Sequence, residues 1–60
     1  GLAEVMDRLD SGDRQLIRLR FFAGRTQSET ARVLGTTQVQ ISRRERRILK
    51  WMREQLLEAQ

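Results

Sequence analysis

The sequence has 60 residues and a formal net charge of +4, with 12 Lys and Arg residues, all but one of them Arg, against eight acidic residues. A chain this short forms one small domain without room for a catalytic cleft. The absence of Cys and His excludes disulfides, the usual metal ligands and the usual general base. We therefore expect no metal, no cofactor and no catalysis. The net charge lies entirely in residues 31–60, which hold six Arg and Lys50 against three Glu, and this segregation favours a polyanionic partner.

A first helix is expected over residues 2–9. Apolar side chains recur there at the spacing of one helix face, namely Leu2, Val5, Met6 and Leu9. This face is more apolar than a surface helix of so small a domain requires, so we expect Leu2, Val5 and Met6, together with part of the next helix, to bind a protein partner.

A second helix is expected over 12–23, because Ser11 is a good N-cap and Gly24 can end a helix in the left-handed conformation. We expect this helix to be buried on more than one side, since its apolar residues spread around most of the circumference. These residues are Leu16, Ile17, Leu19, Phe21 and Phe22.

Two further helices follow, each with its own start signal. Thr26-Gln27-Ser28-Glu29 is a capping box that predicts a helix over 27–34, ending at Gly35. Thr36-Thr37 offers the next N-cap, and the absence of Gly and Pro beyond it predicts a longer helix over 38–57. The fold class is therefore an all-α domain of four helices. Its expected core consists of Leu9, Leu16, Leu19, Phe21, Ala31, Leu34, Ile41, Ile48 and Met52.

A two-turn helix, a turn that contains glycine and a longer helix together form the helix-turn-helix arrangement, here at about residues 27–57. In that motif the first helix crosses the DNA backbone, and the N-terminal residues of the second helix lie in the major groove. The candidate base-reading residues are therefore Gln38, Val39, Gln40, Ser42 and Arg43. Among them, Val39 carries an aliphatic group suited to the thymine methyl.

The predicted helix over 38–57 has two different sides. Ile41, Ile48 and Met52 share one arc, which we expect to face the core. The opposite side carries the cations Arg43, Arg46, Arg47, Lys50 and Arg53. Two charged residues break this pattern because they fall near the apolar arc, and they are Arg44 and Glu45. A basic helix side is often only a solvated surface, but the capped turn beside this one favours contact with phosphate.

Three blocks of the sequence carry a resemblance to a known family. They are Leu9-Asp10 followed by Asp13-Arg14; Leu19-Arg20-Phe21-Phe22 with Gly24, Thr26-Gln27, Glu29 and Ala31; and Leu34-Gly35 with Thr37-Gln38 and Gln40-Ile41-Ser42-Arg43. Through them, nearly the whole chain, taken as one domain over 1–60, resembles region 4 of bacterial sigma factors. Within that family it is most similar to the sporulation and general-stress branch, sporulation sigma F in particular.

The resemblance implies a helical domain that recognises the −35 promoter element in double-stranded DNA and so directs RNA polymerase to promoters for transcription initiation. By position, it implies base contacts from Gln38, Val39, Ser42 and Arg43. It implies DNA-backbone contacts from Gln27, Thr37, Gln40 and Arg47, to which we add the neighbouring Arg46. The partner implied for Leu2, Val5 and Met6 is the beta-subunit flap of the polymerase core, and an anti-sigma factor stays open as a further partner.

The chain departs from its apparent relatives in two respects. Primary sigma factors usually have charged residues where this chain has Gln38, Val39 and Ser42, so its −35 preference should differ from the housekeeping one. Sporulation relatives commonly have an apolar residue where Arg44 stands.

Other functions fit parts of the same pattern. Similar helix-turn-helix domains occur in response regulators, repressors and recombinases, which bind DNA without carrying polymerase to it, and only the blocks 19–22 and 38–43 separate them from this chain. A protein-interaction module with a merely solvated basic helix is a second alternative, which direct binding to promoter DNA would exclude. An enzyme is the least favoured alternative, because Ser42 is a nucleophile without a base.

No stretch of the chain approaches the roughly 20 apolar residues that a membrane span needs, and nothing at its start resembles a signal peptide. We therefore expect a soluble, cytoplasmic protein that binds no membrane, and the resemblance implies that it is bacterial. Gly1 stands where an initiator Met would, which suggests a piece of a longer protein or a residue left from a tag.

Overall fold

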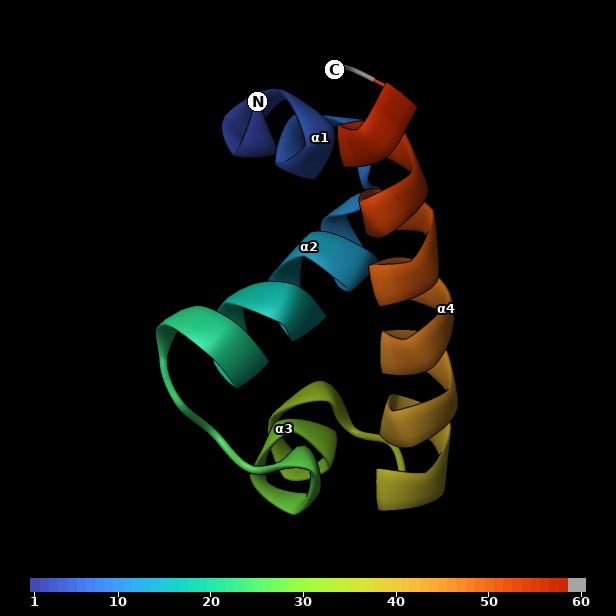
Figure 1. The fold of residues 1–60 in the computed structure, drawn as a ribbon. Coiled ribbons are helices and arrows are strands. Elements are labelled where there is room, and N and C mark those ends of the chain that lie inside the picture. The colour runs from blue at the N-terminus through green and yellow to red at the C-terminus, as the bar shows by residue number, and fades with distance from the viewer. Residues whose placement is uncertain (59–60) are drawn as a thin grey trace.

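The structure, a computed structural model, describes residues 1–58, which contain four α-helices and one π-helical segment. In chain order they are α1 (Leu2–Arg8), α2 (Ser11–Ile17), the π-helical segment η1 (Arg18–Phe22) that continues α2, α3 (Gln27–Leu34) and α4 (Gln38–Glu58). In Figure 1, α4 runs along one side, and α1, α2 with η1, and α3 lie beside it in turn, from its C-terminal to its N-terminal end. The expected all-α, four-helix fold is confirmed. No helix among the described residues is long and apolar enough to span a bilayer.

The helix ends around the turn between α3 and α4 follow the expected capping. At the start of α3 the Thr26 hydroxyl accepts the Glu29 backbone N–H at 3.0 Å, and the Glu29 carboxylate accepts the Thr26 backbone N–H at 2.9 Å. This backbone N–H lowers the pKa of Glu29, because it donates to the charged form of the carboxyl. Gly35 ends α3 with a φ of 71°, and the Thr37 hydroxyl begins α4 by accepting the Gln40 N–H at 3.2 Å. The left-handed backbone of Gly35 and the side chain of Thr37 therefore define the two ends of the turn.

The start of α2 corrects one expected cap. Ser11 is the first helical residue of α2, and Asp10 is its N-cap, with an extended backbone and a side chain that accepts the Asp13 N–H at 2.8 Å. Asp10 combines the cap oxygen with a negative charge, which the positive end of the helix dipole favours. The helix therefore begins one residue earlier than Ser11 alone would predict.

All four helices contribute to one hydrophobic core. Its buried members are Val5, Met6, Leu9, Leu16, Ile17, Ala31, Ile41, Ile48 and Met52. Leu34, Trp51 and Leu56 pack against this cluster while partly exposed. Most of the expected core is confirmed, and α1 adds Val5 and Met6 to it. Arg14 fastens α1 by donating from Nη2 to the Leu9 carbonyl at 2.8 Å and from Nε to the Met6 carbonyl at 3.1 Å.

The expectation that the second helix is buried on several sides is wrong for its C-terminal part. Phe21 is 51% exposed and Phe22 is 66% exposed, and Leu19 is only half-buried. These residues lie in η1, where the Ala23 N–H donates to the Arg18 carbonyl at 2.8 Å. A π-helical turn spans more residues than an α-helical one, so the side chains that follow its start no longer lie where an α-helical wheel puts them. The two aromatic rings therefore face outward.

Thr30 offers a direct test of packing in α3. The side chain is fully buried, and its hydroxyl has no hydrogen-bond partner among residues 1–58. Thr30→Val keeps the shape and removes the unpaired hydroxyl, so we expect stabilisation by about 1 kcal/mol and a higher melting temperature in circular dichroism. The matched control Thr37→Val removes the hydroxyl that caps α4, and we expect it to lower the melting temperature. A lower melting temperature for Thr30→Val would mean that its hydroxyl is satisfied.

Candidate nucleic-acid interface

The pair α3 and α4 has the geometry of a helix-turn-helix. The turn over 35–37 combines the left-handed Gly35 with a hydrogen bond from the Thr36 N–H to the Ala31 carbonyl at 2.9 Å. In Figure 1, α3 lies across the N-terminal end of α4, so the first turn of α4 stands at the edge of the molecule. This end of α4 is available to another macromolecule.

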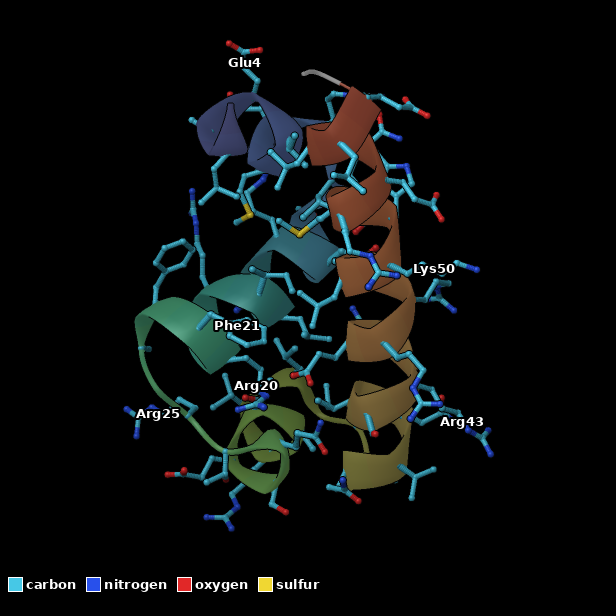
Figure 2. The ribbon with its side chains drawn as sticks, viewed as in Figure 1. Glu4, Arg20, Phe21, Arg25, Arg43 and Lys50 are labelled. Carbon is cyan, nitrogen blue, oxygen red and sulfur yellow. The ribbon has the colours of Figure 1, made fainter. Side chains whose placement is uncertain are left out.

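The outer side of α4 is basic, as its sequence predicts. The exposed cations on this helix, which we call the basic face, are Arg43, Arg46, Arg47, Lys50 and Arg53. In Figure 2 the side chains of Arg43 and Lys50 extend away from the other helices. The apolar arc of Ile41, Ile48 and Met52 is buried in the core. The helix therefore separates a packed side from a cationic side.

Most of the predicted DNA-contacting residues lie close together. Four of them, the base readers that the resemblance implies, line a hollow of about 280 Å³ with Arg46, and they are Gln38, Val39, Ser42 and Arg43. A neighbouring hollow of about 550 Å³ is lined by Gln27, Ser42 and Arg46, together with Glu45, Leu49, Lys50 and Arg53. Val39 is 54% exposed although it is apolar, which leaves its methyl groups free for a thymine methyl.

Three predicted backbone contacts lie outside these two hollows. Thr37 and Gln40 are exposed at the start of α4, where the Thr37 hydroxyl already accepts the Gln40 backbone N–H. Arg47 is exposed and borders a different hollow of about 440 Å³, which Asp10 and Asp13 also line. Arg47 therefore stands nearer to α2 and to acidic side chains than Arg43 does.

A chain of side-chain hydrogen bonds behind the basic face is the main feature that the sequence pattern did not predict. The Glu45 carboxylate accepts from Arg20 Nε on one oxygen and from Gln27 Nε2 at 3.0 Å on the other. Gln27 Oε1 in turn accepts from Gln38 Nε2 at 2.6 Å. We call these four residues the Glu45 relay. It connects η1, the interior side of α4, the start of α3 and the first residue of α4.

A second pair explains the other charged residue near the apolar arc. Arg44 Nη2 donates to Asp13 Oδ1 at 3.2 Å, and the two side chains are 28% and 22% exposed. Asp13 lies on α2, so this pair ties α2 to α4. The only signal in the sequence was that Arg44 and Glu45 broke the pattern of the helix, which marks residues with partners on other elements.

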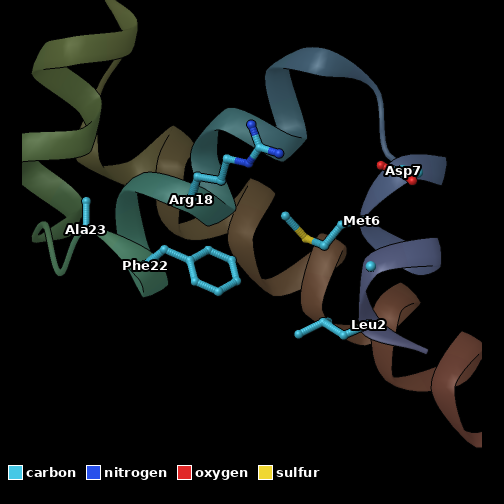
Figure 3. Close-up of a pocket in the computed structure, with 7 residues that line it drawn as sticks. Leu2, Met6, Asp7, Arg18, Phe22 and Ala23 are labelled. Atoms are coloured by element: carbon cyan, nitrogen blue, oxygen red, sulfur yellow. The ribbon is translucent and has the colours of Figure 1, made fainter.

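The apolar surface near the N-terminus corrects part of the predicted partner site. Val5 and Met6 are 5% and 7% exposed, because α1 packs this side onto the core, so Val5 offers no surface to a partner. A groove of about 800 Å³ lies between α1 and η1 instead. We call it the α1–η1 groove, and it is lined by Leu2, Ala3, Met6, Asp7, Arg18, Phe22 and Ala23. Figure 3 shows Leu2 and Phe22 facing the same space across it. Phe22 was not named in the sequence prediction of this site, although its helix contains other exposed apolar residues.

Comparison with known proteins decides the family. The model of the family described as sigma-70, region 4 matches residues 5–54, which include the whole turn and the N-terminal part of α4. The chain belongs to the sigma-70 region 4 family. The expected resemblance is thereby confirmed, and the helix-turn-helix of α3 and α4 is the helix-turn-helix of sigma-70 region 4.

The relatives that match this sigma-70 region 4 chain carry the names of RNA polymerase sigma factors. It is 44% identical over 52 residues to the RNA polymerase sigma-F factor of Priestia megaterium, covering 87% of this chain and 21% of that protein. It is 42% identical over 55 residues to the sigma-F factor of Bacillus licheniformis, covering 92% and 22%. It is 40% identical over 53 residues to the sigma-G factor of Clostridium acetobutylicum, covering 88% and 21%. The chain thus spans about a fifth of the length of these relatives, and no solved structure matches it.

Proposed function

We propose that this chain is the −35-recognition domain of an alternative sigma factor, which places α4 in the major groove of promoter DNA and so helps direct RNA polymerase to its promoters. The observation that carries the proposal is the exposed first turn of α4, which follows a capped turn and continues into a basic face. The names of its relatives support it, since all of those reported are RNA polymerase sigma factors.

The proposed DNA contacts fall into two groups, those to base edges in the major groove and those to the DNA backbone. The base readers are the four that share one hollow at the start of α4, Gln38, Val39, Ser42 and Arg43. The contacts to the DNA backbone come from polar residues at the starts of α3 and α4 and from two cations of the basic face. They are Gln27, Thr37, Gln40, Arg46 and Arg47. This division follows the usual one, in which phosphate contacts position a protein and base-edge contacts select the sequence.

Selection of bound sequences from a random DNA pool tests this function, with the full-length protein assembled in polymerase holoenzyme. A short element at fixed spacing upstream of a −10 element is the expected result. A palindromic site would instead assign the chain to the repressors and response regulators. A pool without enrichment would favour a module that binds protein only.

Binding of the 60-residue chain to duplex DNA should be weak and steeply dependent on salt. A single recognition helix buries little surface, so affinity depends on cations that release counterions from the phosphates. If four cations of the basic face reach phosphates, affinity should fall roughly a hundredfold between about 50 and 200 mM salt. Fluorescence anisotropy titrations at several salt concentrations measure this slope. An affinity that stays constant would show that the basic face does not meet DNA.

The α1–η1 groove is the proposed binding site for the beta-subunit flap of the polymerase core. Leu2 is 48% exposed and Phe22 is 66% exposed, so large apolar side chains are displayed at the rim of this groove. A partner that fills it would remove both from water. This assignment retains Leu2 from the sequence prediction and replaces the buried Val5 by Phe22.

Phe22→Ser should weaken binding to the flap by at least about tenfold, because burying a phenylalanine side chain contributes about 1.5–3 kcal/mol. DNA binding should stay unchanged, since the groove shares no lining residue with the two hollows at the start of α4. Pull-down and calorimetric titration with the flap fragment measure the loss. The matched control is Val33→Ser, which removes an apolar side chain that is 59% exposed on α3. Equal flap binding by the folded Phe22→Ser variant would contradict the assignment.

A further inference from the structure

We infer that Glu45 is a positioning residue for DNA specificity: through Gln27 it sets the direction of the Gln38 amide and thereby the base that Gln38 prefers. The inference rests on the proposed function, which makes Gln38 a base reader. The Glu45 side chain is only 13% exposed, and both of its carboxylate oxygens already accept hydrogen bonds within the protein, from Arg20 and Gln27. It acts through the Glu45 relay.

The direction of each hydrogen bond in the relay follows from its buried end. A carboxylate has only acceptor oxygens, and Arg20 Nε occupies Oε1. The other oxygen accepts from Gln27, so the NH₂ group of Gln27 has to face Glu45. The Gln27 carbonyl oxygen then points to Gln38, where it can only accept. The charge on Glu45 therefore determines which end of the Gln38 amide is held.

Gln38 is left with a defined set of free groups. One of its two N–H bonds is used by Gln27, and the carbonyl oxygen and the second N–H remain for a partner. Adenine presents an N6 donor and an N7 acceptor in the major groove, which match one acceptor and one donor. Guanine presents two acceptors, O6 and N7, and would need two donors. The relay therefore prepares Gln38 for adenine.

The Arg20–Glu45 end of the relay is held in place, and this orders the amides of Gln27 and Gln38. Arg20 is held at both ends of its guanidinium, because Nη1 donates to the Arg25 carbonyl at 2.6 Å while Nε donates to Glu45. Gln38 is exposed and Gln27 is partly exposed, so free glutamine amides at these positions would sample both orientations. Their ordering comes from the half-buried pair behind them, so less rotational freedom is lost when DNA binds.

Glu45→Gln tests the inference by keeping the shape of the side chain and removing its acceptor-only character. A glutamine can offer either oxygen or NH₂ to Gln27, so the amide of Gln38 is no longer held in one direction. Selection of bound duplexes from a random pool, with the 60-residue chain at low salt, should show one A·T position in the native sequence. We expect that preference to fall from about tenfold to within about twofold in Glu45→Gln, with other positions unchanged.

The control is Glu54→Gln, which removes the same charge from an exposed position on α4 outside the relay and should keep the native preference. Gln27→Met is a second variant, since it breaks the relay at the surface and leaves the Arg20–Glu45 pair in place. It should flatten the same position, so the test holds even if Glu45→Gln lowers stability in circular dichroism.

The outcomes separate the inference from the function on which it rests. An A·T preference that survives in both folded relay variants overturns the positioning role and leaves the proposed function intact. A loss spread evenly over all positions means that Glu45 has a structural role only, and it also overturns the inference. A native chain that enriches no sequence overturns the proposed function and the inference together.

Discussion

Replacing Ile41 by alanine is expected to leave the chain largely unfolded at 25 °C. Ile41 is fully buried in the first turns of α4, where it belongs to the core shared by all four helices. Removing a buried isoleucine side chain down to alanine costs about 2–5 kcal/mol, because transfer energy is lost and a cavity remains. A single core in a chain of this size supplies only about 3–5 kcal/mol of net stability. The expected loss is therefore comparable to the whole free energy of unfolding of the chain.

Circular dichroism during urea and thermal unfolding measures this effect. The control is Leu57→Ala, which shortens a side chain that is 60% exposed on the same helix and should change stability by less than about 0.5 kcal/mol. An Ile41→Ala variant with native helicity and an unchanged melting temperature would show that the first turn of α4 does not depend on this contact.

Arg43→Ala and Arg47→Ala should impair DNA binding in two different ways. Arg43 shares a hollow with the other proposed base readers, and its planar guanidinium can pair with guanine O6 and N7. Its loss should cost about 1–3 kcal/mol on the preferred site and flatten the preference at one base pair. Arg47 lies one turn further along α4, where the groove wall presents phosphate. Its loss should weaken binding to all sequences alike and reduce the salt slope by about one unit.

Titrations over a panel of single-base variants of the preferred site separate these effects. Arg18→Ala controls for net charge, because this exposed arginine borders the α1–η1 groove at a distance from the first turn of α4. Parallel affinity profiles for Arg43→Ala and Arg47→Ala would mean that both arginines only add positive charge, and Arg43 would no longer count as a base reader.

The boundaries of α3 and the start of α4 could be predicted from the sequence because they depend on residues close to one another. The capping box of Thr26 with Glu29 and the left-handed Gly35 act within a few residues of the ends that they define. The same holds for the basic face of α4, since residues three and four apart on one helix share a side. The arrangement of the candidate base readers followed from these two features.

Features that depend on distant contacts could not be predicted. Arg20 and Glu45 are 25 residues apart, and Arg44 and Asp13 are 31 apart, so no local pattern shows that they pair. The outward turn of Phe21 depends on the π-helical hydrogen bond in η1, for which helical periodicity has no signal. The burial of Val5 required knowledge of how α1 packs. The sequence alone showed an apolar face there and did not show whether the core or a partner would cover it.

The contact between α1 and α4 gives the molecule a built-in optical probe. Trp51 is the single tryptophan of a chain that has no tyrosine, and the Arg8 guanidinium lies 5.2 Å from the centre of its ring. Indole emission depends on nearby charge and on water, so it would change if α1 lifted away from α4. Stopped-flow mixing with a polymerase fragment could therefore time the response of the N-terminal helix without any attached dye.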